Sequence, residues 1–280
     1  MKTRILTAII ALPVIIVSIV LPLWWHQGLW LFVGIAAFAL GAGLFEFYAL
    51  SKKLKLKADA AIGYLWSTAL FIGFFFDAPS KQPEALIATN AAFLIVLLIS
   101  QMFRFKADFS KMLTGAGVTM LGVMYVAFLG GFLVSVRMGF ETHPQLSTHL
   151  LGYFFLVMFA SDSGAYFVGR AYGTHKLAPD ISPGKTVEGL IGGLFTAALV
   201  AAIATATFMP ELPIPASIPL AVVLAAFGVL GDLSESAMKR GSKTKDAATI
   251  LPGHGGLLDR LDSLLFGAPI LYYFARYYFS

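Results

Sequence analysis

The chain has 280 residues, 58% of them hydrophobic and only 12% charged, with a mean hydropathy of +0.81 and a net charge of +5. This composition is too apolar for a water-soluble domain and indicates a membrane protein, whose basic cytoplasmic loops explain the positive charge without a nucleic-acid partner. The absence of cysteine excludes disulfides, thiolate metal sites and a cysteine nucleophile.

Nine segments are apolar over the length that a membrane-crossing helix needs, about 20 residues. They predict an all-α fold, a polytopic integral membrane helix bundle of about nine transmembrane helices. The first segment resembles a signal peptide, but its apolar core is too long and no small-residue cleavage site follows. We divide the chain into spans one to five, residues 1–150, and a C-terminal part, residues 151–280, that carries the long polar loops. The nine segments are 5–25, 28–50, 60–77, 84–102, 112–136, 149–169, 186–208, 216–235 and 263–279.

The loops between these segments alternate in charge. With the predicted spans laid out, 17 of the 20 basic residues fall on one side, and only Lys81, Arg137 and Arg276 fall on the other. The positive-inside rule then places the N-terminus in the cytoplasm and the C-terminus outside. We therefore expect a multi-pass protein of the inner (plasma) membrane whose polar loops face the cytoplasm. The basic residues on the cytoplasmic side are Lys2, Arg4, Lys52, Lys53, Lys55, Lys57, Arg104, Lys106, Lys111, Arg170, Lys176, Lys185, Lys239, Arg240, Lys243, Lys245 and Arg260.

Five acidic residues lie within or at the ends of the predicted spans, where ionisable groups are costly and usually mark function. The predicted topology places all five toward the cytoplasm, so they can face a single cavity that opens inward. These residues are Glu46, Asp162, Glu188, Asp232 and Glu235.

The segment 161–189 contains Ser-Pro-Gly-Lys-Thr at 182–186, where the predicted helix 186–208 begins. Ser182 and Lys185 therefore lie beside a helix N-terminus, a position that favours anions. The spacing of a Walker A phosphate loop is missing, so Gly-Lys-Thr alone is a weak signal. The loop residues His175 and Lys176 fit either a functional role or simple solvation.

The segment 231–240 places polar residues along one helical face, with acids deeper in the membrane and bases nearer the cytoplasm. In a soluble helix this spacing would indicate a row of intrahelical ion pairs. The cost of burying such a row in a membrane favours a function instead. The residues on this face are Asp232, Glu235, Ser236, Lys239 and Arg240.

The segment 252–263 combines three glycines with two acids. The glycines allow the backbone to approach a phosphate group and to turn N–H groups toward it. Asp259 and Asp262 offer hard oxygen ligands, which suit Mg²⁺. The alternative is a glycine-rich turn followed by acids that stabilise the start of the last helix. For Asp262 both interpretations stay open, whereas we favour Asp259 as a ligand.

These last two segments form one long composite with fixed gaps, which is far more specific than a short glycine motif. Together with SDSGAYFVGR…HKLAP…SPGKTVEG it covers about 60 residues and resembles the signature of the phosphatidate cytidylyltransferases, or CDP-diacylglycerol synthases. The composite runs Ser236-x-x-Lys239-Arg240, Lys245-Asp246 and Leu251-Pro252-Gly253-His254-Gly255-Gly256-x-x-Asp259-Arg260-x-Asp262.

The resemblance implies an integral membrane enzyme that joins phosphatidate to CTP and releases pyrophosphate and CDP-diacylglycerol for phospholipid synthesis. Residues 151–280 would form its catalytic region. The resemblance also implies Mg²⁺, a monovalent cation such as K⁺ assisting in a paired-cation site, and a homodimer of nine-span protomers embedded in membrane lipid.

The implied reaction assigns roles to the polar residues. The expected catalytic set is Asp232, Lys239, Asp259 and His254, and the expected Mg²⁺ ligands are Asp232 and Asp259, with Asp262 as a third candidate. His254 either donates a proton to the leaving pyrophosphate or orients the glycine loop. The residues expected to bind substrate or to line the cavity are Ser182, Lys185, Arg240, Lys245, Asp246, Gly255, Gly256, Arg260 and Asp162.

Two other functions fit the same residues. A CTP-dependent membrane lipid kinase, of the polyprenol or phytol kinase type, would move the γ-phosphate of CTP and leave CDP. An ion-coupled transporter would use the intramembrane acids as a cation path, although the chain lacks the internal repeat that many transporters have.

Overall fold

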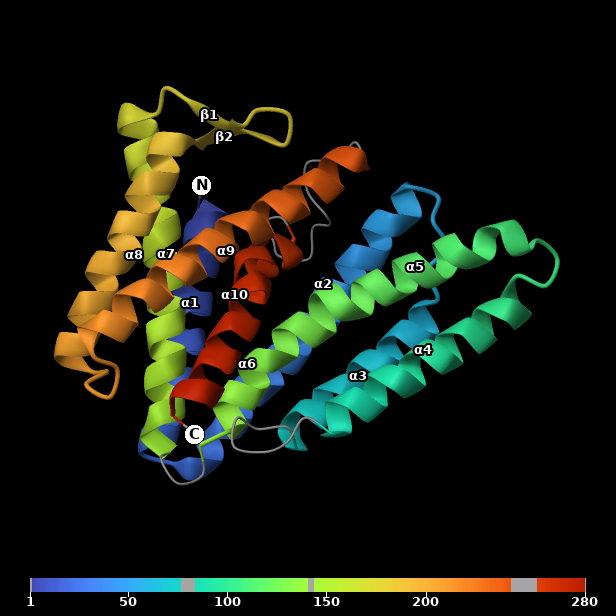
Figure 1. Ribbon diagram of the computed structural model, residues 1–280, viewed down its shortest axis with the longest axis horizontal. Coiled ribbons are helices and arrows are strands. Elements are labelled where there is room, and N and C mark those ends of the chain that lie inside the picture. The colour runs from blue at the N-terminus through green and yellow to red at the C-terminus, as the bar shows by residue number, and fades with distance from the viewer. Residues whose placement is uncertain (1, 77–83, 141–143, 243–255, 280) are drawn as a thin grey trace.

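The computed structural model describes residues 2–76, 84–140, 144–242 and 256–279, and this part of the chain is helical apart from one short β-hairpin and connecting loops (Figure 1). The described residues of each predicted span lie mainly in helices, so the expectation of an all-α membrane bundle is confirmed. The helices are α1 (Lys2–Val20), α2 (Leu29–Lys53), α3 (Ala60–Phe76), α4 (Glu84–Arg104), α5 (Met112–Gly122), α6 (Leu129–Met138), α7 (Pro144–Tyr172), α8 (Val187–Thr207), α9 (Ile214–Gly241) and α10 (Leu258–Tyr278), with short 3₁₀ turns at Leu21–Leu23, His26–Gly28 and Phe109–Lys111.

Six helical segments of the described chain are long and apolar enough to cross a membrane. They are His26–Lys53, Glu84–Arg104, Phe109–Met138, Gln145–Tyr172, Val187–Thr207 and Ile214–Gly241. The apolar segments Ala11–Leu23 and Ala60–Phe76 are shorter. Helix α10 is less apolar than the others, because it contains Asp262, Arg276 and several tyrosines. The membrane interpretation is therefore confirmed, while the count of nine crossings stays a prediction.

The outside of the bundle is apolar, as contact with lipid requires. Large hydrophobic side chains are exposed on most of the long helices, including Phe38 on α2, Leu65 on α3, Phe103 on α4, Phe167 on α7 and Phe195 on α8. A water-soluble protein would bury a contiguous apolar surface of this kind. In a bilayer these side chains contact acyl chains, and the helices satisfy their own backbone hydrogen bonds.

The predicted span 112–136 is a single helical run with a change of pitch in its middle. Between α5 and α6, residues Val123–Phe128 form a π-helical turn. Such turns insert one residue into a helix and occur frequently at functional sites. This turn places Tyr125 against α10, where its ring lies 6.3 Å from that of Phe266.

The C-terminal helices pack in succession: α7 on α8, α8 on α9, α9 on α10, and α10 on α6. Small residues permit the close approach of α7 and α8, since a Cβ at Gly193 would lie 2.9 Å from the carbonyl oxygen of Ser161. Figure 1 shows that the β-hairpin lies at the end of the bundle where the chain begins, and that the C-terminus lies at the opposite end. This is the arrangement expected for an odd number of crossings.

Candidate active site

An unpredicted β-hairpin carries the segment 176–186 at one end of the bundle. Strand β1 (Lys176–Ala178) pairs antiparallel with β2 (Ser182–Thr186). The buried Thr186 caps α8, because its hydroxyl accepts a hydrogen bond of 3.1 Å from the N–H of Gly189. The hairpin therefore enters α8 at a fixed point.

Glu188, in the first turn of α8, holds the other end of the hairpin. Its carboxylate accepts hydrogen bonds from the N–H and hydroxyl of Thr174 and from the N–H of His175, and it lies 2.6 Å from Nδ1 of His175. His175 thus contacts a structural anchor, which supports the loop interpretation of this residue. The predicted intramembrane acid Glu188 secures the loop above the bundle.

The hairpin is fixed to α9 by two contacts. Nζ of Lys185 lies 2.7 Å from Oδ2 of Asp232, and Nε of Arg240 donates a 3.1 Å hydrogen bond to the carbonyl oxygen of Ile181. The second carboxylate oxygen of Asp232 accepts a hydrogen bond from the hydroxyl of Ser236 at 3.2 Å. Residues predicted from two separate motifs therefore meet at one place.

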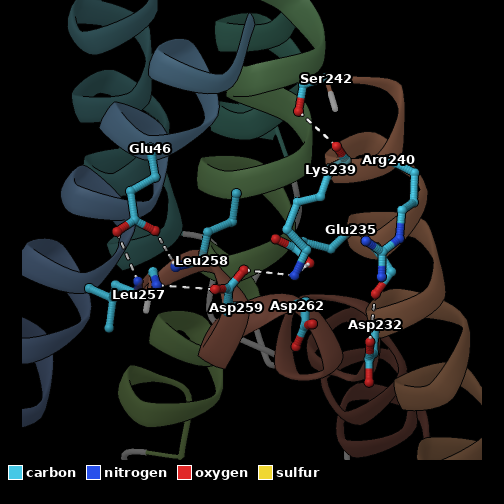
Figure 2. A network of polar contacts seen from close by, with 12 residues as sticks. Glu46, Asp232, Glu235, Lys239, Arg240, Ser242, Leu257, Leu258, Asp259 and Asp262 are labelled. Carbon is cyan, nitrogen blue, oxygen red and sulfur yellow. Dashed lines mark hydrogen bonds and ion pairs between the residues drawn. The ribbon is translucent and has the colours of Figure 1, made fainter. Parts of the chain in front are cut away.

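Lys239 connects α9 with α10 (Figure 2). Its ammonium group forms ion pairs with Glu235, one turn earlier on α9, and with Oδ1 of Asp259 at 2.9 Å. The other oxygen of Asp259 accepts a 3.0 Å hydrogen bond from the N–H of Gly256. Glu235 is 0% exposed, so its contact with Lys239 places a cation beside a fully buried acid.

Two further carboxylates join this cluster. Asp262 is buried, accepts a 2.6 Å hydrogen bond from the N–H of Ser263 and interacts electrostatically with Asp232 and Lys239. Asp162 on α7 interacts with Asp232, Lys185 and Arg260. Gly231 lets the helices meet, because it packs against the backbone carbonyl of Asp262 without room for a side chain. Asp162 and Asp262 therefore lie close enough to Asp232 to feel its charge.

No group of three or more histidine or acidic side chains is arranged to hold a metal ion in the described ranges. The donors nevertheless fit Mg²⁺, because they are carboxylate oxygens, and Mg²⁺ commonly takes only one or two carboxylates together with substrate phosphates. Asp232 projects toward Lys185, and Asp259 projects toward Lys239, which also pairs with Glu235.

For several residues predicted to form the site, the structure shows no contact that tests their role. Lys245, Asp246, His254 and Gly255 lie outside the described residues. Ser182 begins β2 opposite Ala178, and Arg260 is exposed in the first turn of α10. The expectations for these residues stay predictions.

Two side chains from the N-terminal half reach the site. Tyr125, on the π-helical turn, is 6% exposed, and its hydroxyl has no hydrogen-bond partner among the described residues. It interacts electrostatically with Asp262, Glu235 and Asp232. Nothing in the sequence distinguished this tyrosine from the many aromatic residues of the spans. The sequence identified Glu46 as an acid that is costly to place in a membrane span, but it did not indicate that Glu46 binds the amides of Leu257 and Leu258.

These observations define the class of the protein: an integral membrane helix bundle with a cluster of acids and lysines at one end. The chain belongs to the cytidylyltransferase family, whose sequence profile matches residues 2–278. The family resemblance seen in the polar motifs therefore extends over almost the whole chain.

Individual relatives agree with this assignment. A phosphatidate cytidylyltransferase of Bacillus subtilis is 36% identical over 284 residues, which cover 98% of this chain and 97% of that protein. One from Staphylococcus haemolyticus is 36% identical over 274 residues, with 97% of each chain covered. One from Haemophilus influenzae is 47% identical over 154 residues, 53% of each chain.

Proposed function

We propose that this chain is a CTP:phosphatidate cytidylyltransferase of the inner membrane, which makes CDP-diacylglycerol and pyrophosphate for phospholipid synthesis. The observation that carries the proposal is the cluster of Lys185, Asp232, Lys239 and Asp259 at one end of an apolar bundle, in a chain similar over nearly its full length to proteins of that name. A site at this position suits a lipid phosphate held at the membrane surface and a nucleotide that arrives from water.

The proposed reaction is a displacement at the α-phosphorus of CTP. A phosphate oxygen of phosphatidate attacks, a new P–O bond forms, and the bond to the β-phosphate breaks as pyrophosphate leaves. The attacking oxygen is already anionic, so no strong general base is needed. Alignment and neutralisation of charge then account for the catalysis.

The lysines of the cluster supply that neutralisation. Lys185 and Lys239 stand 23% and 15% exposed and are paired with Asp232 and Asp259. When phosphate oxygens take over these ammonium groups, charge-assisted hydrogen bonds align CTP and phosphatidate. The freed carboxylates of Asp232 and Asp259, with Asp262 beside them, would hold Mg²⁺, which neutralises charge on the transferring phosphates when bound. K⁺ is the second cation to test in the same assay.

The topology and assembly are part of the proposal. Basic residues concentrate on the side of the site, which favours a cytoplasmic orientation and attracts anionic substrates. The family resemblance further implies a homodimer. Mass measurement of the purified protein in detergent tests the dimer. The orientation is tested by introducing single cysteines into the loops, since the chain has none, and labelling them from either side of the membrane.

Product analysis tests the reaction. Purified protein is incubated with phosphatidate, Mg²⁺ and CTP labelled at either the α- or the γ-phosphorus. We expect the α-label to enter the lipid and the γ-label to leave as pyrophosphate. Entry of the γ-label into lipid would instead establish a kinase. Cation uptake into sealed vesicles without consumption of CTP would establish a transporter.

A further inference from the structure

The start of α10 is held by an acid from the opposite half of the chain. Glu46, on α2, accepts a 2.9 Å hydrogen bond from the N–H of Leu257 and a 2.7 Å hydrogen bond from the N–H of Leu258 (Figure 2). These two amides belong to the group of helix N-terminal donors that have no partner within the helix. The partners lie 211 and 212 residues apart in the sequence.

Glu46 binds these amides out of reach of solvent in the described part of the chain. It is 0% exposed, and its neighbours Leu44 and Phe47 on α2 belong to the same buried hydrophobic cluster as Leu258 on α10. An ionised carboxylate in such a place is costly unless hydrogen bonds and a helix N-terminus compensate it. Both compensations come from α10, so Glu46 and the first turn of α10 depend on each other.

Three successive amides, those of Gly256, Leu257 and Leu258, are divided between Glu46 and Asp259. Gly256 donates to Oδ2 of Asp259, whereas Leu257 and Leu258 donate to Glu46. Repulsion between the carboxylates of Glu46 and Asp259 also keeps Asp259 away from the amides that Glu46 binds. Because Glu46 occupies two of the three amides, Asp259 retains one oxygen, Oδ1, for Lys239.

We infer that Glu46 is a positioning residue for the transfer reaction: it holds the first turn of α10 so that one oxygen of Asp259 is directed to Lys239 and the substrates. This role rests on the proposed function. Without Glu46, Asp259 becomes the nearest carboxylate for all three amides and turns away from Lys239. Glu46 touches neither the substrates nor the metal and acts only through Asp259.

Gly256 gives the arrangement a second probe. A Cβ at this position would lie 2.7 Å from Oε2 of Glu46 and 3.3 Å from Oδ2 of Asp259. Gly256→Ala should therefore displace both carboxylates in the wild-type background. In a Glu46→Ala background the closer of these contacts is gone, so we expect the second substitution to reduce kcat by less than it does alone.

The experiment compares wild type, Glu46→Gln, Glu46→Ala and the control Ser51→Ala. Ser51 is also buried on α2, but its hydroxyl donates only to the carbonyl oxygen of Tyr48. Hydrogen exchange of peptides covering 256–262 and, for comparison, 187–207 is measured together with kcat and with KM for CTP and phosphatidate. Gln keeps one acceptor oxygen and the reach of Glu, whereas Ala removes both.

We expect faster exchange at 256–262 alone, in the order Ala, Gln, wild type. We also expect kcat to fall by about 10- to 100-fold, with both KM values within about twofold, because a small misplacement of a reacting group has an effect of that size. Exchange and kcat that match those of Ser51→Ala would overturn the inference, as would a kcat that falls only in proportion to the folded fraction. A wild-type enzyme that forms no CDP-lipid would contradict the proposed function instead, and the exchange comparison would still test whether Glu46 holds the first turn of α10.

Discussion

Lys185 and Asp232 form an ion pair of 2.7 Å between strand β2 and helix α9. Their side chains are 23% and 35% exposed, so both remain accessible from the aqueous end of the bundle. A partly exposed pair of this kind contributes little to stability. Its position between the hairpin and the carboxylate cluster gives it another use, since an incoming phosphate can replace Asp232 as the partner of Lys185.

Lys185→Ala should lower kcat/KM by about 10- to 100-fold, because a hydrogen bond to a charged group contributes roughly 1.5–3 kcal/mol. The loss should appear mainly as a higher KM for CTP or phosphatidate, measured by formation of labelled CDP-lipid. Lys176→Ala is the matched control on the same hairpin, because Lys176 donates to the backbone carbonyl of Pro183. Equal kcat/KM values for Lys185→Ala and wild type would contradict the phosphate-binding role.

Asp259→Asn should abolish CDP-lipid formation and leave a folded protein. The substitution preserves the shape of the side chain but removes the charge that pairs with Lys239, while Lys239 keeps Glu235 as its partner. Activity, thermal stability in detergent and elution volume are measured together. Asp108→Asn is the control, since Asp108 is an exposed loop acid whose ion-pair partner is Lys111. Normal turnover of Asp259→Asn at saturating Mg²⁺ would remove Asp259 from the metal site.

Hydropathy was sufficient to predict where the helices lie, because apolar length is a local property of the sequence. The hairpin was not predicted, since Ser182–Thr186 contains proline and glycine, which are unfavourable in strands. Its formation depends on tertiary anchors, the cap of Thr186 on α8 and the hydrogen bonds that Glu188 accepts. Such anchors are visible only when the chain is folded.

The sequence named individual residues for the site, and their roles stay predictions, but it did not predict which of them pair. The motifs assigned acids to a metal and lysines to phosphates, whereas the structure pairs Lys185 with Asp232 and Lys239 with Asp259. Carboxylates that are partly shielded from water favour opposite charges nearby, and these two lysines supply them. The contact from Glu46 to α10 was beyond sequence reasoning, because the cost of a buried acid identifies the residue and not its partner.

Thr186→Ala should loosen the hairpin without unfolding the bundle. Loss of an N-cap costs about 1 kcal/mol, and the effect is concentrated in the first turn of the helix. We expect faster hydrogen exchange over 176–190, a higher KM for CTP because Lys185 is the neighbouring residue, and nearly full rescue by Thr186→Ser. Thr207→Ala, at the end of α8, is the control, since its hydroxyl donates within the helix to Ile203. A change in thermal stability with no change in exchange at 176–190 would contradict the cap.

Removal of divalent cations should abolish product formation, and Mg²⁺ should restore it, because the available donors are hard carboxylate oxygens. Asp232→Asn should raise the Mg²⁺ concentration for half-maximal rate by at least about tenfold, the size of effect that altered metal surroundings commonly produce. Asp180→Asn serves as the control, since Asp180 lies exposed in the hairpin turn. The Mg²⁺ titration is repeated at several fixed CTP concentrations, so that depletion of the magnesium–CTP complex is separated from a weakened site. Full activity in excess chelator, or an unchanged Mg²⁺ requirement in Asp232→Asn, would exclude Asp232 as a ligand.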